Sequence, residues 1–163
     1  MTSKSLLNGK RVLIVDDEPD VLEILEELLP MCYLEKASSF GEARELLETQ
    51  DFDIAILDIM GVEGYKLLEI ANEKRIIAVM LTAHAFSPEE TIRSYKGGAA
   101  LYVPKEEMAQ ITTFLNDILE AKEKGKSLWW RWLKRFASSY DKKFGPDWRD
   151  SDKEFWEKFE YWG

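Results

Sequence analysis

The chain has 163 residues, 45% of them hydrophobic, which fits one domain of ordinary size with a small appendage. No apolar run approaches the ~20 residues that span a bilayer, and the first residues lack an apolar region with a cleavage site, so we expect neither a transmembrane helix nor a signal peptide. The net charge of −9 argues against general nucleic-acid binding, because that affinity comes mainly from cations placed on phosphates.

Charge and aromatic content change near residue 124. Residues 1–124 carry 13 Lys+Arg and 24 Asp+Glu, whereas residues 125–163 carry 9 and 7 and hold all six Trp residues. We therefore expect a domain over 1–124 and an aromatic-rich tail over 125–163. Cys32 is the only cysteine and cannot form an internal disulfide, and together with the lack of a signal peptide this predicts a cytoplasmic protein.

The first third of the chain reads as two strand–helix units. Val12–Val15 is apolar throughout and predicts a buried strand, and the apolar residues that follow recur at helical spacing with Pro19 in the first turn. Tyr33–Ala37 predicts a short second strand. The stretch Ser39–Glu42 is a capping box that opens a helix through Leu47.

The middle of the chain repeats this alternation. Ile54–Leu57 predicts a third strand, which ends at Asp58, and a helix is expected from about residue 65 to 73. Ile76–Leu81 predicts a fourth strand that ends at Thr82. A second capping box, Ser87–Glu90, opens a helix to residue 95, which Gly97 and Gly98 terminate.

The last expected unit is a fifth strand over Ala100–Val103 and a helix from about Glu106 to Lys122. Five strand–helix units in series, with strands that are apolar throughout, indicate burial on both faces of each strand. The sequence therefore predicts an α/β fold, a doubly wound parallel five-stranded sheet between two layers of helices.

Polar side chains stand where four of the predicted strands end. Asp16 and Asp17 follow the first strand, Asp58 ends the third, Thr82 ends the fourth and Lys105 lies just beyond the fifth. In an open parallel sheet, ligands bind outside the carboxyl ends of the strands. Any one of these residues alone is typical of a solvated loop or surface. Acids, a hydroxyl and an amine at the ends of four strands together indicate a binding or catalytic site.

The residue types in this set suit phosphoryl transfer. Clustered carboxylates repel one another unless a cation joins them, and oxygen ligands suit Mg²⁺. A carboxylate can act as a nucleophile toward phosphorus, while an ammonium and a hydroxyl offset charge on the phosphoryl oxygens. Because the chain has no Gly-rich phosphate loop, we expect the phosphoryl donor to be another molecule.

Four motifs together resemble the receiver domain of two-component response regulators, over about residues 8–122. They are VLIVDDEP, DIAILDI, VMLTAH and ALYVPK, in the family's order. The resemblance implies a flavodoxin-like (βα)5 fold. It places the phosphoacceptor on Asp58, the switch hydroxyl on Thr82, the switch aromatic on Tyr102 and the phosphate-contacting amine on Lys105.

The resemblance also implies a metal site and partners. Asp17 and Asp58 would ligate Mg²⁺ directly, Asp16 through water, and Met60 through its backbone carbonyl. The donor would be a histidine kinase or a phosphotransfer protein, and the only chemistry would be self-phosphotransfer and autodephosphorylation. Phosphorylation would draw Thr82 toward the phosphate, let Tyr102 turn inward and switch a surface for a downstream protein.

Two segments depart from the family's pattern. The run DIMGVEG after the phosphoacceptor is shorter than usual and lacks a Pro, and Glu106 stands where the family commonly has a cis-Pro after Lys105. We expect no cis bond there, because cis peptides are essentially confined to proline. The short run leaves an alternative open, a phosphorylation-independent pseudo-receiver scaffold. His84 lies two residues past Thr82. It either contacts the water that attacks the phosphoryl group during dephosphorylation, or it is an exposed loop side chain.

Aromatic residues of the tail recur at helical spacing before Gly145 and Pro146, which predicts a helical hairpin with an aromatic stripe. Three interpretations stay open. The stripe packs on the domain, or it forms a partner or homodimer surface, since exposed aromatic patches usually mark interaction. The third is a helix at a membrane interface, because LWWRWLKRF mixes Trp with Arg131, Lys134 and Arg135.

Overall fold

The computed structural model describes residues 6–83 and 88–123. The predictions for the aromatic tail, for His84 and for the Ser87 cap lie outside these residues. Within the described part, no helix is long and apolar enough to cross a membrane.

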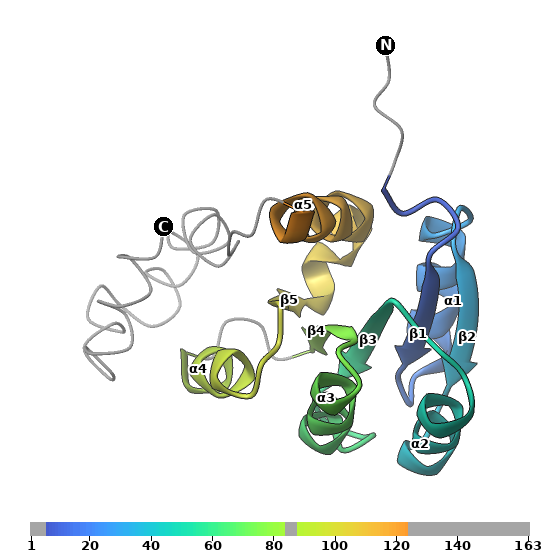
Figure 1. Ribbon diagram of the computed structural model, residues 1–163. Helices are drawn as coiled ribbons and strands as arrows, with labels where there is room; N and C mark the ends of the chain where they lie inside the picture. Colours follow the sequence, from blue (N-terminus) through green and yellow to red (C-terminus); the bar gives the residue numbers. More distant parts are fainter. Residues whose placement is uncertain (1–5, 84–87, 124–163) are drawn as a thin grey trace.

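The described residues form five strands and five α-helices that alternate along the chain, with a short 3₁₀ helix before the last one (Figure 1). The strands are β1 Arg11–Val15, β2 Tyr33–Ala37, β3 Ile54–Asp58, β4 Ile77–Thr82 and β5 Leu101–Pro104. The helices are α1 Pro19–Leu28, α2 Phe40–Thr49, α3 Gly64–Glu73, α4 Pro88–Lys96, η1 Lys105–Gln110 and α5 Ile111–Glu123.

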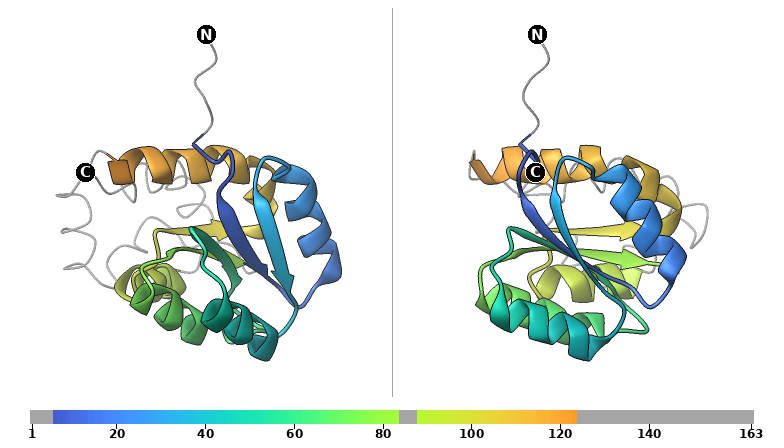
Figure 2. Two further views of the ribbon diagram at one scale, coloured as in Figure 1. Left: turned by 45° about the vertical axis from the view of Figure 1, so that its right-hand side comes forward. Right: turned by 90° about the vertical axis from the view of Figure 1, so that its right-hand side faces the viewer.

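All five strands are parallel and lie in one sheet of order β2-β1-β3-β4-β5, which confirms the predicted flavodoxin-like fold. Figure 2 shows α1 and α5 on one face of the sheet and α2, α3 and α4 on the other. The central strand β3 is buried at every residue, as its continuous apolar sequence predicts for a strand covered on both faces. From β1 the chain adds β2 on one side of the sheet and then β3, β4 and β5 on the other, as in a doubly wound fold. The direction of winding therefore reverses between β1 and β3.

Local signals in the sequence start the first two helices. Pro19 occupies the start of α1, where its missing N–H is not needed. At α2 the Ser39 hydroxyl accepts a hydrogen bond from the backbone N–H of Glu42 at 3.2 Å. Both helix starts agree with the prediction, and α2 extends to Thr49 rather than ending at Leu47.

The start of the last helix was predicted wrongly. An α-helix was expected from Glu106, but Lys105–Gln110 forms a 3₁₀ helix and α5 begins at Ile111. Pro104 fixes the entry with a φ of −65°, and the tighter 3₁₀ turns bring Met108 into the core before the chain runs back along α5. The described residues contain no cis peptide bond, so the trans bond expected after Lys105 is confirmed.

The turn from β3 to α3 is very tight. The backbone N–H of Gly64 donates to the carbonyl of Ile59 at 3.2 Å, so only a few residues separate the strand end from the helix. A Cβ added at Gly64 would overlap the carbonyl oxygen of Asp58 and lie 2.8 Å from Cα of Ile59. Glycine is therefore needed here for the close backbone approach.

Replacement of Gly64 by alanine tests this packing. We expect Gly64→Ala to lower the free energy of unfolding by about 1–3 kcal/mol, because a backbone clash cannot be relieved by a side-chain rotation. Gly41→Ala is the matched control, since a Cβ there meets nothing within 4 Å, and it should leave stability unchanged or raise it by up to about 1 kcal/mol. Denaturant unfolding measures both, and equal effects would contradict this account.

Candidate functional site

Four of the predicted site residues meet at the carboxyl edge of the sheet. The parallel register pairs Val15 with Leu57 and Asp58 with Leu81, so the strands end side by side. Asp16 follows β1, while Asp58 and Thr82 are the last residues of β3 and β4. All three are nearly inaccessible, with exposed fractions of 0%, 4% and 1%. The site is therefore a set of buried polar groups rather than a solvated loop.

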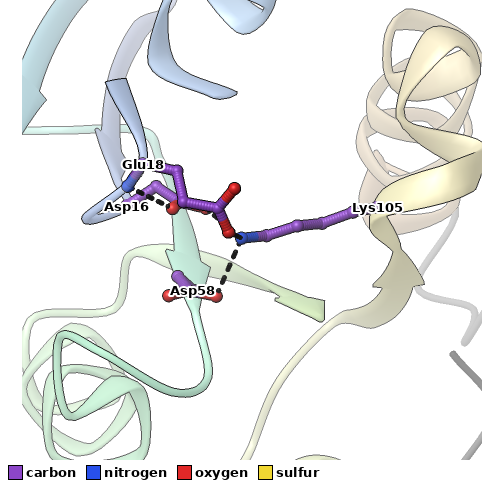
Figure 3. Close-up of polar contacts among 4 residues, drawn as sticks. All are labelled: Asp16, Glu18, Asp58 and Lys105. Atoms are coloured by element: carbon purple, nitrogen blue, oxygen red, sulfur yellow. Dashed lines mark hydrogen bonds and ion pairs between the residues drawn. The ribbon is translucent and has the colours of Figure 1, made fainter. Parts of the chain in front are cut away.

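Lys105 reaches this edge from the start of η1 and contacts three carboxylates (Figure 3). Its Nζ lies 2.8 Å from Asp16 Oδ2, 2.9 Å from Glu18 Oε1 and 3.4 Å from Asp58 Oδ1. The contact with Glu18 is a hydrogen bond, whereas Asp16 Oδ2 accepts no hydrogen bond despite the short ion-pair distance. The ammonium therefore sits closer to the acids of the β1–α1 turn than to Asp58.

The two buried aspartates are held in an environment that disfavours their charge. Burial, followed by the charge of Asp16, raises the pKa of Asp58 from 3.8 to about 6, although Lys105 acts in the opposite direction. Burial likewise raises the pKa of Asp16, against the contact with Lys105 and the N–H of Glu18. The single ammonium does not offset the cost of two buried carboxylates, and a further cation would relieve it.

Lys105 itself stays charged. Burial alone would lower the pKa of its ammonium, but the contacts with Asp16 and Glu18 and the charges of Asp16 and Asp58 outweigh burial and raise it. Its side chain is only 13% exposed, so solvent screens these contacts weakly. A fixed positive charge therefore stands beside Asp58.

The acidic groups fit a hard cation such as Mg²⁺, but the set differs from the expected one. Carboxylate oxygens of Asp16, Asp17 and Glu18 all lie within 4.8 Å of one another, and Asp58 is not part of this group. The buried Oδ2 of Asp16 is paired with the Lys105 ammonium at 2.8 Å, and carboxylate oxygens are the ligands that Mg²⁺ prefers. Sequence reasoning missed Glu18, although it is the third acid of the run DDEP.

The loop after Asp58 is folded against the acidic pair. Gly61 has a φ of 58°, and a Cβ there would lie 2.6 Å from the carboxyl carbon of Asp17. The carbonyl of Met60, the expected metal ligand, accepts a hydrogen bond from the backbone N–H of Val62, while the Met60 side chain is 59% exposed. A metal would therefore have to use the remaining lone pair of that carbonyl.

The two expected switch residues both lie in the interior. Thr82 ends β4, and Tyr102 in the neighbouring strand β5 has an exposed fraction of 0%. The Tyr102 hydroxyl donates to Glu90 Oε2 of α4 at 3.4 Å. Tyr102 therefore already has the inward position that was expected to follow phosphorylation, and it links β5 to α4.

The raised pKa of Asp58 makes stability depend on pH. Between pH 3.8 and about 6 the folded protein holds a proton on Asp58 that the unfolded chain has lost, so stability falls as pH rises through this window. We expect Asp58→Asn to be about 1–3 kcal/mol more stable than wild type near neutral pH in a metal-free buffer. The difference should shrink toward zero near pH 3.8.

The control is Asp51→Asn, which removes an exposed carboxylate just before β3. Its unfolding free energy should follow that of wild type across the same pH range. A difference between Asp58→Asn and wild type that stays constant with pH would contradict the electrostatic account.

The chain is similar to known signalling proteins over most of its described part. A family model for the response regulator receiver domain matches residues 12–116. The chain is 32% identical over 149 residues to the two-component response regulator ARR18 of Arabidopsis thaliana, covering 88% of this chain and 21% of that protein. It is also 32% identical over 106 residues to the response regulator protein PilR of Pseudomonas aeruginosa, covering 61% and 23%.

Solved structures share the fold. The CheY-like receiver domain protein from Methanospirillum hungatei has a TM-score of 0.59 and 27% identity, covering 71% of this chain and 99% of that one. The chain spans about a fifth of the length of the two curated relatives above. The match of the family model over more than half of the residues places this chain in the family of response regulator receiver domains of two-component systems.

Proposed function

We propose that this chain is a cytoplasmic, phosphorylation-dependent response regulator that accepts a phosphoryl group on Asp58 in a Mg²⁺-dependent reaction. The donor is the phosphohistidine of a histidine kinase or phosphotransfer protein, and the result is a changed surface for a downstream protein. The observation that carries the proposal is the buried Asp58 carboxylate with the Lys105 ammonium 3.4 Å away at the carboxyl edge of the sheet.

In the proposed reaction an oxygen of the Asp58 carboxylate attacks phosphorus, the P–N bond to the donor imidazole breaks, and an acyl phosphate forms. With a pKa of about 6, Asp58 is mostly ionised near neutral pH and available as the nucleophile. Lys105 contributes a fixed positive charge where the phosphoryl oxygens gather negative charge. In this reaction the group that changes covalently is Asp58, so the protein acts on itself rather than on a separate substrate.

The metal in this proposal is Mg²⁺, held by Asp16, Asp17 and Asp58 with the Met60 carbonyl. When bound, it would neutralise charge on the phosphoryl oxygens. Support comes from the acidic group at the β1–α1 turn, where carboxylate oxygens of Asp16, Asp17 and Glu18 lie within 4.8 Å of one another. Burial raises the pKa of both Asp16 and Asp58, and a bound cation would stabilise their ionised forms.

The proposed output runs through Thr82 and Tyr102 to the surface formed by α4, β5 and α5. A phosphoryl group on Asp58 would attract the Thr82 hydroxyl from the neighbouring strand end. Thr82 pairs in register with Pro104, two residues after Tyr102 in β5, and the Tyr102 hydroxyl donates to Glu90 of α4, so a change at Thr82 would reach α4 through β5. The downstream partner is a protein, with a second copy of this chain as one form of it, and the aromatic tail over 125–163 is a further interaction element.

A phosphorylation-independent scaffold is the second candidate function. The observation that favours it is the short loop after Asp58. In this loop the backbone N–H of Val62 donates a hydrogen bond to the Met60 carbonyl, and Gly61 lies against the Asp17 carboxylate. In that case the acidic edge would be structural, stabilised by Lys105, and partner binding would ignore phosphate. The two functions therefore differ in whether Asp58 reacts.

Acetyl phosphate with Mg²⁺ separates the two candidates. We expect intact-mass spectrometry to detect one phosphoryl group on wild type and on Asp51→Asn, and none on Asp58→Asn. Omission of Mg²⁺ should abolish the product, because phosphoryl charge is then not neutralised. An unmodified wild-type chain, or equal modification of Asp58→Asn, would contradict the proposal and favour the scaffold.

A further inference from the structure

We propose that Glu18 is a positioning residue that holds the Lys105 ammonium on the β1 side of the site and thereby competes with Asp58 for it. Because Lys105 is assigned to the phosphoryl group, the consequence for phosphorylation rests on the proposed function. The competition between the two acids is a property of the chain's own residues and is tested separately.

The contacts of Lys105 are unequal. Asp16 Oδ2 lies 2.8 Å from Nζ, and Glu18 Oε1 accepts a hydrogen bond from it at 2.9 Å, whereas Asp58 Oδ1 lies 3.4 Å away. In Figure 3 the Lys105 side chain extends from the right, and its amine lies beside the Glu18 carboxylate and above that of Asp58. The ammonium has three N–H groups, and it is placed closer to the two acids of the β1–α1 turn than to Asp58. The hydrogen bond to Glu18 therefore helps to hold the amine away from Asp58.

The backbone around Glu18 explains why its side chain points across the edge. Glu18 is the N-cap residue of α1, yet its carboxylate makes no capping hydrogen bond to that helix. Its backbone N–H instead donates to Asp16 Oδ1 at 2.9 Å, which fixes the turn between β1 and α1. The side chain is left to bind Lys105, a residue 87 positions later in the chain.

A phosphoryl group on Asp58 would change this balance. Its oxygens would offer Lys105 a stronger acceptor than Glu18, so the amine would leave Glu18 when Asp58 is modified. The Glu18 side chain is 58% exposed, and such ion pairs contribute modestly. Loss of Glu18 should therefore strengthen the interaction of Lys105 with an anion on Asp58 by about two- to fivefold.

The first test measures Lys105 without any phosphate. Reaction of lysine amines with an acylating reagent, followed by peptide mass spectrometry, gives the labelling rate of Lys105. We expect Glu18→Ala to raise this rate by about two- to fivefold, because the amine then keeps one close carboxylate contact, that with Asp16, instead of two. Glu23→Ala, which removes an exposed charge from α1, should leave it unchanged.

A second variant separates contact from charge. Glu18→Asp keeps the negative charge but is shorter by one methylene, so it should not reach Lys105 and should behave like Glu18→Ala. If Glu18→Asp labels at the wild-type rate, or if Glu18→Ala does, Glu18 does not position the amine and the proposal is overturned.

The second test adds the phosphoryl mimic beryllofluoride with Mg²⁺ and follows binding by NMR. We expect Glu18→Ala to bind it about two- to fivefold more tightly than wild type and Glu23→Ala to match wild type. Weaker binding by Glu18→Ala would mean that Glu18 holds the cation and would overturn the competition. If no chain binds beryllofluoride while Glu18 still controls Lys105 labelling, the proposed function fails and the positioning role stands.

Discussion

The structure of this edge depends on two carboxylates, Asp16 and Asp58, that are buried within reach of one ammonium group. A buried charge is tolerated only when it is paired, and Lys105 pairs with both while also binding Glu18. The pairing is incomplete, because burial and mutual repulsion still raise the pKa of Asp58 to about 6. The protein thus tolerates both buried carboxylates, but a single ammonium does not fully neutralise them. A further cation would stabilise the edge, which agrees with the proposed uptake of a cation and a phosphoryl group.

The fold creates this arrangement through parallel strands and close turns. Parallel register brings the ends of β1, β3, β4 and β5 to one edge, and Lys105 follows directly after β5 at that edge. The glycines at 61 and 64 let the loop after Asp58 lie directly on the acidic pair and on the strand end. The shortness of this loop is therefore accommodated by backbone packing, and the buried carboxylates keep their places.

Much of the site was predictable because a polar residue at the end of an apolar run marks the end of a buried strand. Apolar runs that stop at Asp16, Asp58 and Thr82 reveal both the parallel sheet and the residues at its edge, and the geometry brings these together with Lys105 as expected. Glu18 was missed, because its partner lies 87 positions away and no local pattern reports such a contact. The 3₁₀ start of the last helix was missed since it depends on how Met108 reaches the core, which periodicity cannot show.

A thermal unfolding series with Mg²⁺ tests directly whether Asp58 is a ligand of the proposed cation at the acidic edge. Near neutral pH, increasing Mg²⁺ should raise the unfolding temperature of wild type, because a ligand that binds only the folded state stabilises it. Asp58→Asn lacks one of the ligands and the charge that the cation relieves, so its unfolding temperature should respond much less. An equal rise in both proteins, or no rise in wild type, would contradict the account.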